Sequence, residues 1–188
     1  IIMDNANDLA IGKINVEGST PYLQLSDGAE LGEDILVAGF PLSILLANNN
    51  VKITRGIVSS LSGVKNNFSE IQIDAAIQPG NSGGPIVNDK AELIGVSTYT
   101  MKPVADINPQ NVNFGKKVDL VKSFLKSNQI KIPPKKNKKK MSSKQIAKIL
   151  EKSTVNLFCE NTKSHWNYLA SKKKVNQPIL EVLDAINN

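Results

Sequence analysis

One serine of the chain, Ser82, lies in the glycine-rich run Gly80-Asn81-Ser82-Gly83-Gly84-Pro85. A serine hydroxyl becomes a useful nucleophile when a tight turn exposes its oxygen and directs nearby backbone N–H groups at the developing oxyanion. Gly80 has access to backbone conformations that are closed to residues with a β-carbon, and Pro85 ends the turn. The run therefore predicts a serine nucleophile, and the alternative is an ordinary glycine-rich hairpin with a buried serine.

The segments on both sides of this turn have the composition of β-strands. Residues 70–74 alternate as a half-buried strand does, and residues 85–87 begin a second strand that ends at a polar turn. A third run, residues 93–101, is rich in β-branched side chains. An exposed nucleophile needs a turn between two strands, so these flanks favour the catalytic interpretation of Ser82.

Several motifs in a fixed order resemble the HtrA/Deg branch of the trypsin-fold serine proteases. The strongest are Asp74-Ala75-Ala76-Ile77, which runs into the Ser82 turn, and Leu93-Ile94-Gly95. Similar stretches that agree in order are residues 7–14, 31–42, 53–59 and 113–121. The resemblance spans about residues 4–128, and independent motifs in the right order make it specific.

This resemblance implies a mainly β fold, an antiparallel β-barrel of the chymotrypsin type. Residues 1–20 are expected to be the end of a first barrel and the inter-barrel segment, and residues 21–128 a second barrel with a C-terminal helix. Residues 129–141 are predicted to be a Lys/Pro-rich linker, and residues 142–188 a small, mainly helical, basic tail.

The resemblance also assigns roles to individual residues. Ser82 would attack the scissile carbonyl, and Asp8 would orient and support the histidine that takes the serine proton. The backbone N–H groups of Gly80 and Ser82 would form the oxyanion hole, with Asn81 between them shaping the loop. For Asp8, the local sequence leaves open a simpler alternative, a carboxylate at the edge of an N-terminal strand.

The histidine departs from the family pattern. The chain contains one, His165, which lies beyond the protease-like region, whereas the family's catalytic histidine precedes the aspartate. We expect His165 to be a surface residue. Since the chain begins with Ile1 and Ile2, we expect an N-terminally truncated protease whose fragment is inactive alone, and a pseudoprotease that binds peptides or acts as a scaffold is the alternative.

Substrate preference follows from residues aligned with the specificity pocket. Ala76 stands six positions before Ser82, where tryptic enzymes carry a carboxylate, so a cation-selecting pocket is not expected. Thr98, Tyr99 and Thr100 lie on the strand expected to pair with the substrate backbone. With Val112 at the pocket wall, they predict a preference for small or medium aliphatic side chains.

Charge divides the chain at about residue 129. Residues 1–128 hold 10 Lys+Arg and 13 Asp+Glu, whereas residues 129–188 hold 13 and 4. We expect residues 135–140, with five lysines, to be a solvated linker. Nucleic acid is not an expected partner, and membrane contact is the weaker alternative.

Ser142 and Ser143 predict a helix cap, with Ile146, Ile149 and Leu150 on one face of the helix. A strand is predicted at residues 155–159 and a helix from Pro178, and the tail is expected to dock on the barrel, on itself in an oligomer, or on a partner.

The remaining expectations concern cofactors and location. A single cysteine, Cys159, excludes a disulfide within the chain, and with one histidine no metal site and no cofactor is expected. The family resemblance implies a serine endopeptidase that cleaves unfolded or misfolded polypeptides through an acyl-enzyme. It also implies a periplasmic or cell-envelope location, and homo-oligomerisation is left open.

Overall fold

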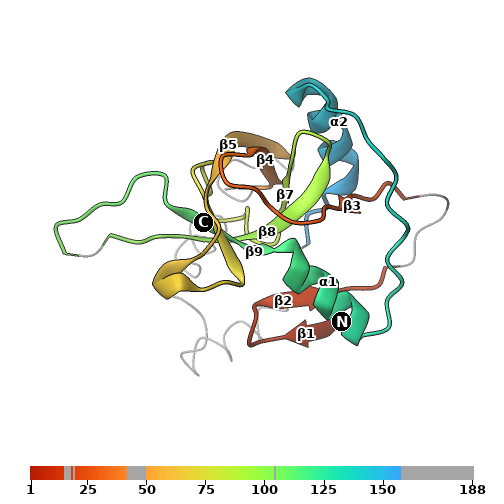
Figure 1. Cartoon of the computed structure of the whole chain (residues 1–188), viewed down its shortest axis with the longest axis horizontal. Coiled ribbons are helices and arrows are strands. Elements are labelled where there is room, and N and C mark those ends of the chain that lie inside the picture. Colours follow the sequence, from red (N-terminus) through yellow and green to blue (C-terminus); the bar gives the residue numbers. More distant parts are fainter. Residues whose placement is uncertain (15–17, 19, 42–49, 104, 158–188) are drawn as a thin grey trace, which may run out of the picture.

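The computed structural model of the chain describes residues 1–14, 18, 20–41, 50–103 and 105–157 (Figure 1). A small hairpin comes first, formed by β1 (Ile2–Asp4) and β2 (Leu9–Ile11), which pair antiparallel with each other. A larger sheet follows, with β3 (Gln24–Leu25), β4 (Asp34–Gly39), β5 (Lys52–Ser60), β6 (Glu70–Ile73), β7 (Pro85–Val87), β8 (Glu92–Thr100) and β9 (Asn113–Lys117). The strands expected from the sequence on either side of Ser82 are therefore present.

The larger sheet closes into a barrel. Its strand order is β3-β8-β7-β4-β5-β6-β9, and β8 also pairs with β9, so the two ends of the sheet meet. All neighbours in this ring are antiparallel, and only the two-residue β3 is added parallel to β8. This confirms the predicted mainly β, antiparallel barrel.

Alternating apolar side chains fill the inside of the barrel. Ile35 and Val37 of β4 point to the same interior as Ile71 and Ile73 of β6, and all four side chains are buried. The period of two in these strands places every second side chain on one face of the sheet. Burial of this face is the main stabilising contribution to the barrel.

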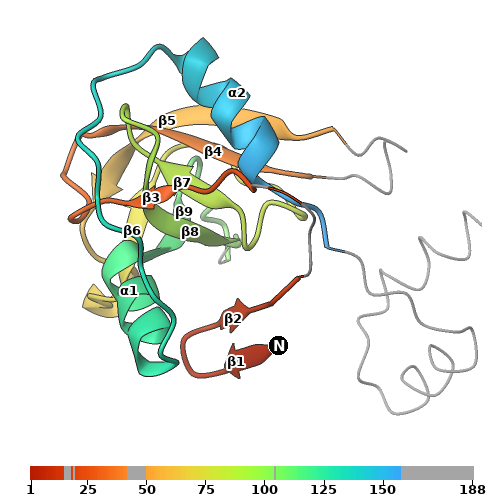
Figure 2. The same ribbon diagram turned by 90° about the vertical axis from the view of Figure 1, so that its right-hand side faces the viewer.

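Two α-helices follow the barrel, α1 (Val118–Ser127) directly after β9 and α2 (Ser143–Ser153) after an extended connection; a short 3-10 turn, η1 (Val64–Asn66), precedes β6. Helix α1 lies beside the β1–β2 hairpin on one side of the barrel, and α2 lies on another side (Figure 2). Helix α2 begins with a capping box, in which Ser142 and Gln145 each bond the other's backbone N–H. This satisfies N–H groups that a helix start leaves unpaired, and it confirms the cap predicted at Ser142.

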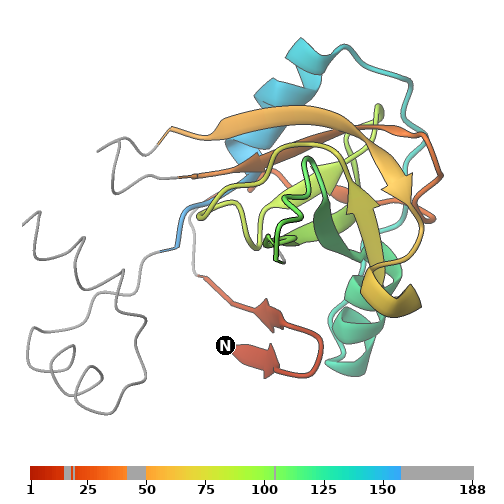
Figure 3. The same cartoon turned by 90° about the vertical axis from the view of Figure 1, so that its left-hand side faces the viewer.

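Helix α2 covers the outer face of β4 (Figure 3). Its side chains Ile146 and Leu150 are buried in a cluster with Leu36, Ala38 and Val87. Strand β4 is thus buried on both faces, which explains why it reads as a continuous apolar run instead of an alternating one. Of the three docking alternatives for the tail, the structure shows its first helix on the barrel.

The lysines before α2 are mostly exposed, as in the solvated linker that we expected, but three of them also contact the barrel. Lys135 Nζ lies 2.6 Å from Asp27 Oδ2, and Lys140 Nζ lies 2.7 Å from Asp89 Oδ2. Lys138 Nζ also donates to a backbone carbonyl of the barrel, at 3.3 Å. Opposite net charges on the barrel and the tail give the physical reason, since acidic side chains are available to attract the lysines.

The remaining part of the tail is described only in part. Residues 155–157 follow α2 without strand structure, and the rest of the strand predicted at residues 155–159 lies outside the described residues. Cys159, His165 and the helix predicted from Pro178 lie outside them as well. Within the described ranges, no helix has the length and apolar character needed to cross a membrane. The domain boundaries stay predictions.

Candidate active site

The Ser82 turn divides its backbone N–H groups into two sets. The amide of Asn81 donates to Gln78 O at 2.9 Å, and the amides of Gly83 and Gly84 donate to Ser97 O and Asn81 O, both at 2.8 Å. By contrast, no described residue accepts from the amide of Gly80 or Ser82, and both residues are exposed. Since an unpaired backbone donor normally finds a partner, these two amides are available to a ligand. They are the two that the sequence assigned to an oxyanion hole.

Glycines are required in this turn for two different reasons. Gly80 and Gly83 have φ angles of +101° and +84°, in the region that residues with a β-carbon rarely adopt. Gly84 has no such angle, but a β-carbon there would lie 2.0 Å from Ala38 O. The turn is anchored to the end of β4 through this close approach and through Phe40 N, which donates to Gly80 O at 3.2 Å.

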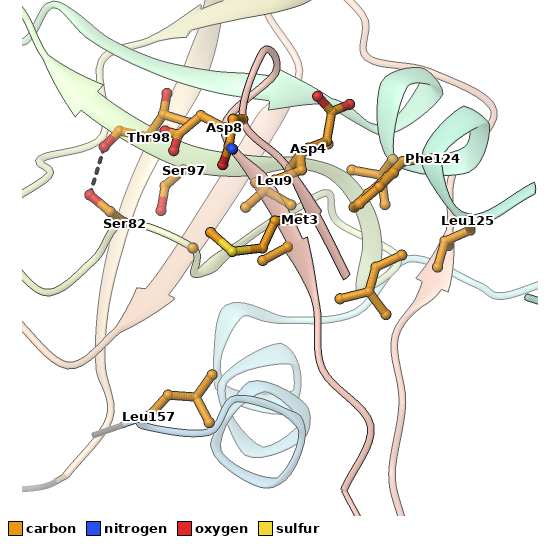
Figure 4. Close-up of a pocket in the computed structure, with 16 residues that line it drawn as sticks. Met3, Asp4, Asp8, Leu9, Ser82, Ser97, Thr98, Phe124, Leu125 and Leu157 are labelled. Carbon is orange, nitrogen blue, oxygen red and sulfur yellow. Dashed lines mark hydrogen bonds between the residues drawn. The ribbon is translucent and has the colours of Figure 1, made fainter. Parts of the chain in front are cut away.

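The Ser82 hydroxyl is exposed and points to β8. It donates to Thr98 O at 2.6 Å, the contact drawn as a dashed line in Figure 4. No other side-chain partner is found for it among the described residues. The hydroxyl is thus held by a carbonyl oxygen, which accepts a hydrogen bond but cannot act as the general base that a serine nucleophile needs.

A second serine, which the sequence analysis did not single out, supports the turn from beneath. Ser97 is fully buried on β8, and its hydroxyl donates to Asn81 O and, at 3.2 Å, to Gly84 O. Its backbone N–H also donates to Gly84 O, at 2.9 Å. No sequence signal distinguished it, because Ser97 is one of several polar residues in β8.

Asn81 is buried between the turn and β4. Its side chain is 3% exposed, and its Oδ1 has no hydrogen-bond partner among the described residues. A β-carbon added to Gly39 would lie 2.5 Å from this oxygen, so the side chain rests directly against the glycine. The predicted role of Asn81 in shaping the loop is consistent with this packing, but the structure does not test it.

Asp8 lies at the turn of the β1–β2 hairpin. It is exposed and has a φ of +55°, uncommon for a residue other than glycine. The turn is ordered by Asp4, whose carboxylate accepts from Asn7 N at 3.1 Å and from Asn7 Nδ2 at 2.7 Å. The side-chain hydrogen bond from Asn7 holds the pKa of Asp4 below its usual value. The sequence did not single out Asp4, because aspartate and asparagine occur in turns of many kinds.

Asp8 and Ser82 line the same cavity from opposite elements. The cavity has a volume of about 520 Å³ and separates the hairpin from the barrel. Within the described residues no hydrogen bond joins the Asp8 carboxylate to Ser82. Figure 4 shows Met3 and Leu9 of the hairpin on one side of this space and Leu157 of the tail on another. Because the cavity lies between Asp8 and Ser82, there is room for another group between the two side chains.

The residues predicted to contact substrate meet at one end of β8. Thr100 Oγ1 donates to Ile77 O at 3.3 Å, next to Ala76, and Met101 N donates to Val112 O at 2.9 Å. Ala76, Thr100 and Val112 are thereby brought to the same end of the barrel. The size of a pocket among them, and the role of Thr98 in pairing with a substrate backbone, stay predictions.

Tyr99 points away from this end. Its ring stacks on Phe114 with centroids 4.8 Å apart, and its hydroxyl donates to Glu70 Oε2 at 3.1 Å. Glu70 also forms a buried ion pair with Lys116, at 2.7 Å. Burial, together with the Glu70 carboxylate, raises the pKa of Tyr99. The side chain therefore ties β8 to β6 and β9, and the predicted contact of Tyr99 with substrate stays a prediction.

Comparison with known proteins points to one family. The model of the trypsin-like peptidase domain matches residues 1–96. The chain is 35% identical over 166 residues to the uncharacterized protein y4bJ of Sinorhizobium fredii. The aligned region covers 85% of this chain and 26% of y4bJ. It is 30% identical over 131 residues to the serine endoprotease DegS of Haemophilus influenzae, covering 65% of this chain and 36% of DegS. With the serine protease Do-like HtrA of Bacillus subtilis it shares 34% identity over 105 residues, 50% of this chain and 23% of that protein.

A solved structure shares the fold. The serine endoprotease from Yersinia pestis superimposes with a TM-score of 0.53 and 28% sequence identity, over 66% of this chain and 41% of that one. The chain spans between 23% and 36% of the length of the three relatives named above. Together with the glycine turn that exposes Ser82, these similarities show that the chain belongs to the trypsin-like peptidase domain family, as an HtrA-like trypsin-fold protease.

Proposed function

We propose that this chain carries the nucleophile of a serine endopeptidase that cleaves unfolded polypeptides through an acyl-enzyme. The observation that carries the proposal is the pairing of backbone amides in the Ser82 turn. Three neighbouring amides have acceptors, whereas those of Gly80 and Ser82 are left open beside an exposed hydroxyl. Two such donors beside a nucleophile can stabilise the oxyanion of a tetrahedral intermediate, and one donor contributes about 3 to 4 kcal/mol in comparable enzymes.

In the proposed reaction, Ser82 Oγ forms a bond to the scissile carbonyl carbon while its proton passes to an imidazole. The carbonyl oxygen becomes an oxyanion beside the amides of Gly80 and Ser82, and the C–N bond breaks as the imidazole returns the proton to the leaving amine. Water then hydrolyses the acyl-enzyme by the same route. Asp8 would keep the imidazole oriented and stabilise its protonated form.

The imidazole must come from outside the described residues, because the single histidine of the sequence, His165, lies outside them. The cavity between Asp8 and Ser82 is where it would act. Without an imidazole, only oxyanion and binding contributions are left. Since we expect His165 to be a surface residue and not this base, we expect the 188-residue chain by itself to show no turnover.

For the acyl side of the substrate, we propose a preference for small or medium aliphatic side chains. Ala76 provides no carboxylate for a cationic side chain. Thr100 is hydrogen-bonded to Ile77, the residue after Ala76, and Val112 is hydrogen-bonded to Met101, the residue after Thr100. Selection by volume alone discriminates by about 1 to 3 kcal/mol. A periplasmic or envelope location fits a protease of this kind and is proposed with it.

One observation favours a second candidate, a pseudoprotease that binds peptides without cleaving them. The Ser82 hydroxyl donates to the Thr98 carbonyl, and no described side chain is placed to deprotonate it. A protein without a base would keep the barrel and the substrate strand while losing catalysis. The two candidates differ in the reactivity of Ser82.

Fluorophosphonate labelling of the protein at its full natural length tests the proposal. We expect Ser82 to be modified, as read by peptide mass spectrometry, and Ser82→Ala to lose the label. Asp8→Asn should slow labelling by about 10³-fold or more, because the imidazole would lose its orientation. A folded full-length protein in which Ser82 does not react would support the pseudoprotease instead.

A further inference from the structure

The end of the described tail faces the nucleophile turn. Residues 153–157, here termed the tail wall, line a cavity of about 380 Å³ opposite Gly80 and Ser82. Gly39 and Phe40, at the end of β4, complete the turn side of this cavity. A segment more than 70 positions from Ser82 in the sequence thus borders the space beside the nucleophile.

The barrel holds the tail wall in place through α2. Ile146 and Leu150 of this helix are 1% and 0% exposed, and Thr154 N donates to Leu150 O at 2.9 Å as the chain leaves the helix. At the start of the helix, Met141 N donates to Asp89 O at 2.8 Å. Both ends of α2 are therefore tied down, so the direction in which the chain leaves it is fixed.

Most of the tail wall borders the Gly80 side of Ser82. The Ser82 hydroxyl contacts Thr98 of β8, whereas the cavity of about 380 Å³ includes Gly80 and no residue of β8. Of the tail wall, Leu157 also lines the cavity of about 520 Å³, which includes Thr98. If β8 pairs with the substrate before the scissile bond, the residues after that bond extend toward Gly80. The tail wall is then in position to contact the leaving-group side of the substrate.

The chemistry of the tail wall suits an extended polypeptide with apolar side chains. Val155 and Leu157 are 62% and 80% exposed, and Leu157 lines both cavities beside Ser82. Thr154 Oγ1 and Asn156 Nδ2 are enclosed but have no hydrogen-bond partner among the described residues. A peptide backbone supplies partners for polar groups of this kind, and its side chains bury apolar surface.

We propose that the tail wall forms the leaving-group side of the substrate groove. Val155 and Leu157 select an apolar side chain in the first two residues after the scissile bond. This inference rests on the proposed endopeptidase function. It adds a specificity determinant that comes from beyond the barrel and its C-terminal helix.

Mapping of cleavage sites in a denatured protein, such as unfolded casein, tests this inference on the full-length protein. Mass spectrometry of the products gives the residues before and after each cut separately. We expect apolar residues after the cut to be enriched about tenfold, and Leu157→Ser to lower this to about twofold or less. The preference before the cut should not change. Leu31→Ser, which removes another exposed leucine far from both cavities, serves as the matched control.

The outcomes separate the inference from the function on which it rests. Cleavage by Leu157→Ser with an unchanged profile after the cut would overturn the inference and leave the endopeptidase intact. Faster cleavage of all sites by this variant would also overturn it, since the tail wall would then cover the groove instead of shaping it. If the wild-type protein neither cleaves nor reacts with fluorophosphonate at Ser82, the proposed function falls and the inference falls with it.

Discussion

The two elements that face each other across the candidate site are held very differently. The Ser82 turn shares backbone hydrogen bonds with β4 and β8 and rests on the buried Ser97. Among the described strands, β1 and β2 of the hairpin that carries Asp8 pair only with each other, and its residues Ile2 and Met3 are 43% and 67% exposed. A closed barrel can fix a turn at its edge, whereas an isolated two-stranded hairpin is marginally stable in water.

This difference separates two requirements of a serine protease. The proposed oxyanion donors and the proposed nucleophile lie in one turn that is bonded to the barrel, so the barrel would preorganise them. The distance from Asp8 to Ser82 depends on how the hairpin sits across the cavity between them. If the proposed roles hold, the catalytic geometry is fixed on the serine side and adjustable on the aspartate side.

Among the changes that test the difference between the Ser82 turn and the hairpin, we expect the largest loss of stability from adding one methyl group to Gly84. In Gly84→Ala the new β-carbon would lie 2.0 Å from Ala38 O, and backbone must move to relieve the contact. We expect a loss of about 3 kcal/mol or more in the free energy of unfolding, measured by urea denaturation. Gly12→Ala, just after β2, meets no atom within 4 Å and should change stability by about 0.5 kcal/mol or less. Equal stability of both variants would remove the contrast.

Hydrogen exchange compares the two elements without any substitution. The amide of Gly83, which donates to Ser97 O, should exchange only through large-scale opening of the barrel. The hydrogen-bonded amides of the β1–β2 pair should exchange at least about a hundredfold faster, through local opening. Similar protection factors in NMR exchange spectra would show that the hairpin is as firmly held as the turn.

A smaller effect is expected when the buried hydroxyl under the turn is removed. In Ser97→Ala both carbonyls that accept from the hydroxyl keep a second backbone donor, so the cost should be only about 1 kcal/mol. Ser82→Ala, which removes an exposed hydroxyl of the same type, should change stability by about 0.5 kcal/mol or less. Thermal unfolding of the two variants measures this difference. If Ser82→Ala were the more destabilising, Ser97 would not be the support of the turn.

The smallest effect is expected in the hairpin, from pH. The pKa of Asp4 is lowered in the folded state, so its contribution to the hairpin turn is present above the unfolded pKa, near 4, and is lost as the pH falls through the folded value. The amide proton of Asn7 should shift in this acid range, while that of Gly83 should not. The contact between Asp4 and Asn7 would be contradicted if the Asn7 amide shift of the wild-type protein did not change with pH and equalled that of the Asp4→Asn variant.

Much of the fold was predictable because local patterns specify it. The alternation of residues 70–74, the β-branched run after residue 92 and the serine pair at the start of α2 predict elements that the structure contains. The Ser82 turn was predictable for the same reason, since glycine and proline restrict the backbone at defined positions. The supporting roles of Ser97 and Asp4 were not, because a single small polar residue has no distinctive pattern.

The sequence by itself determined that a serine sits in a glycine-rich turn between two strands, and that a basic tail follows an acidic barrel. Only the tertiary structure decided which amides of that turn have no acceptor, that Lys135 and Lys140 pair with the barrel, and that residues 153–157 face Ser82. The reason is the range of the interactions involved. Backbone preferences act over a few residues and leave a trace in the sequence, whereas pairing and packing join residues far apart in the chain and appear only when it has folded.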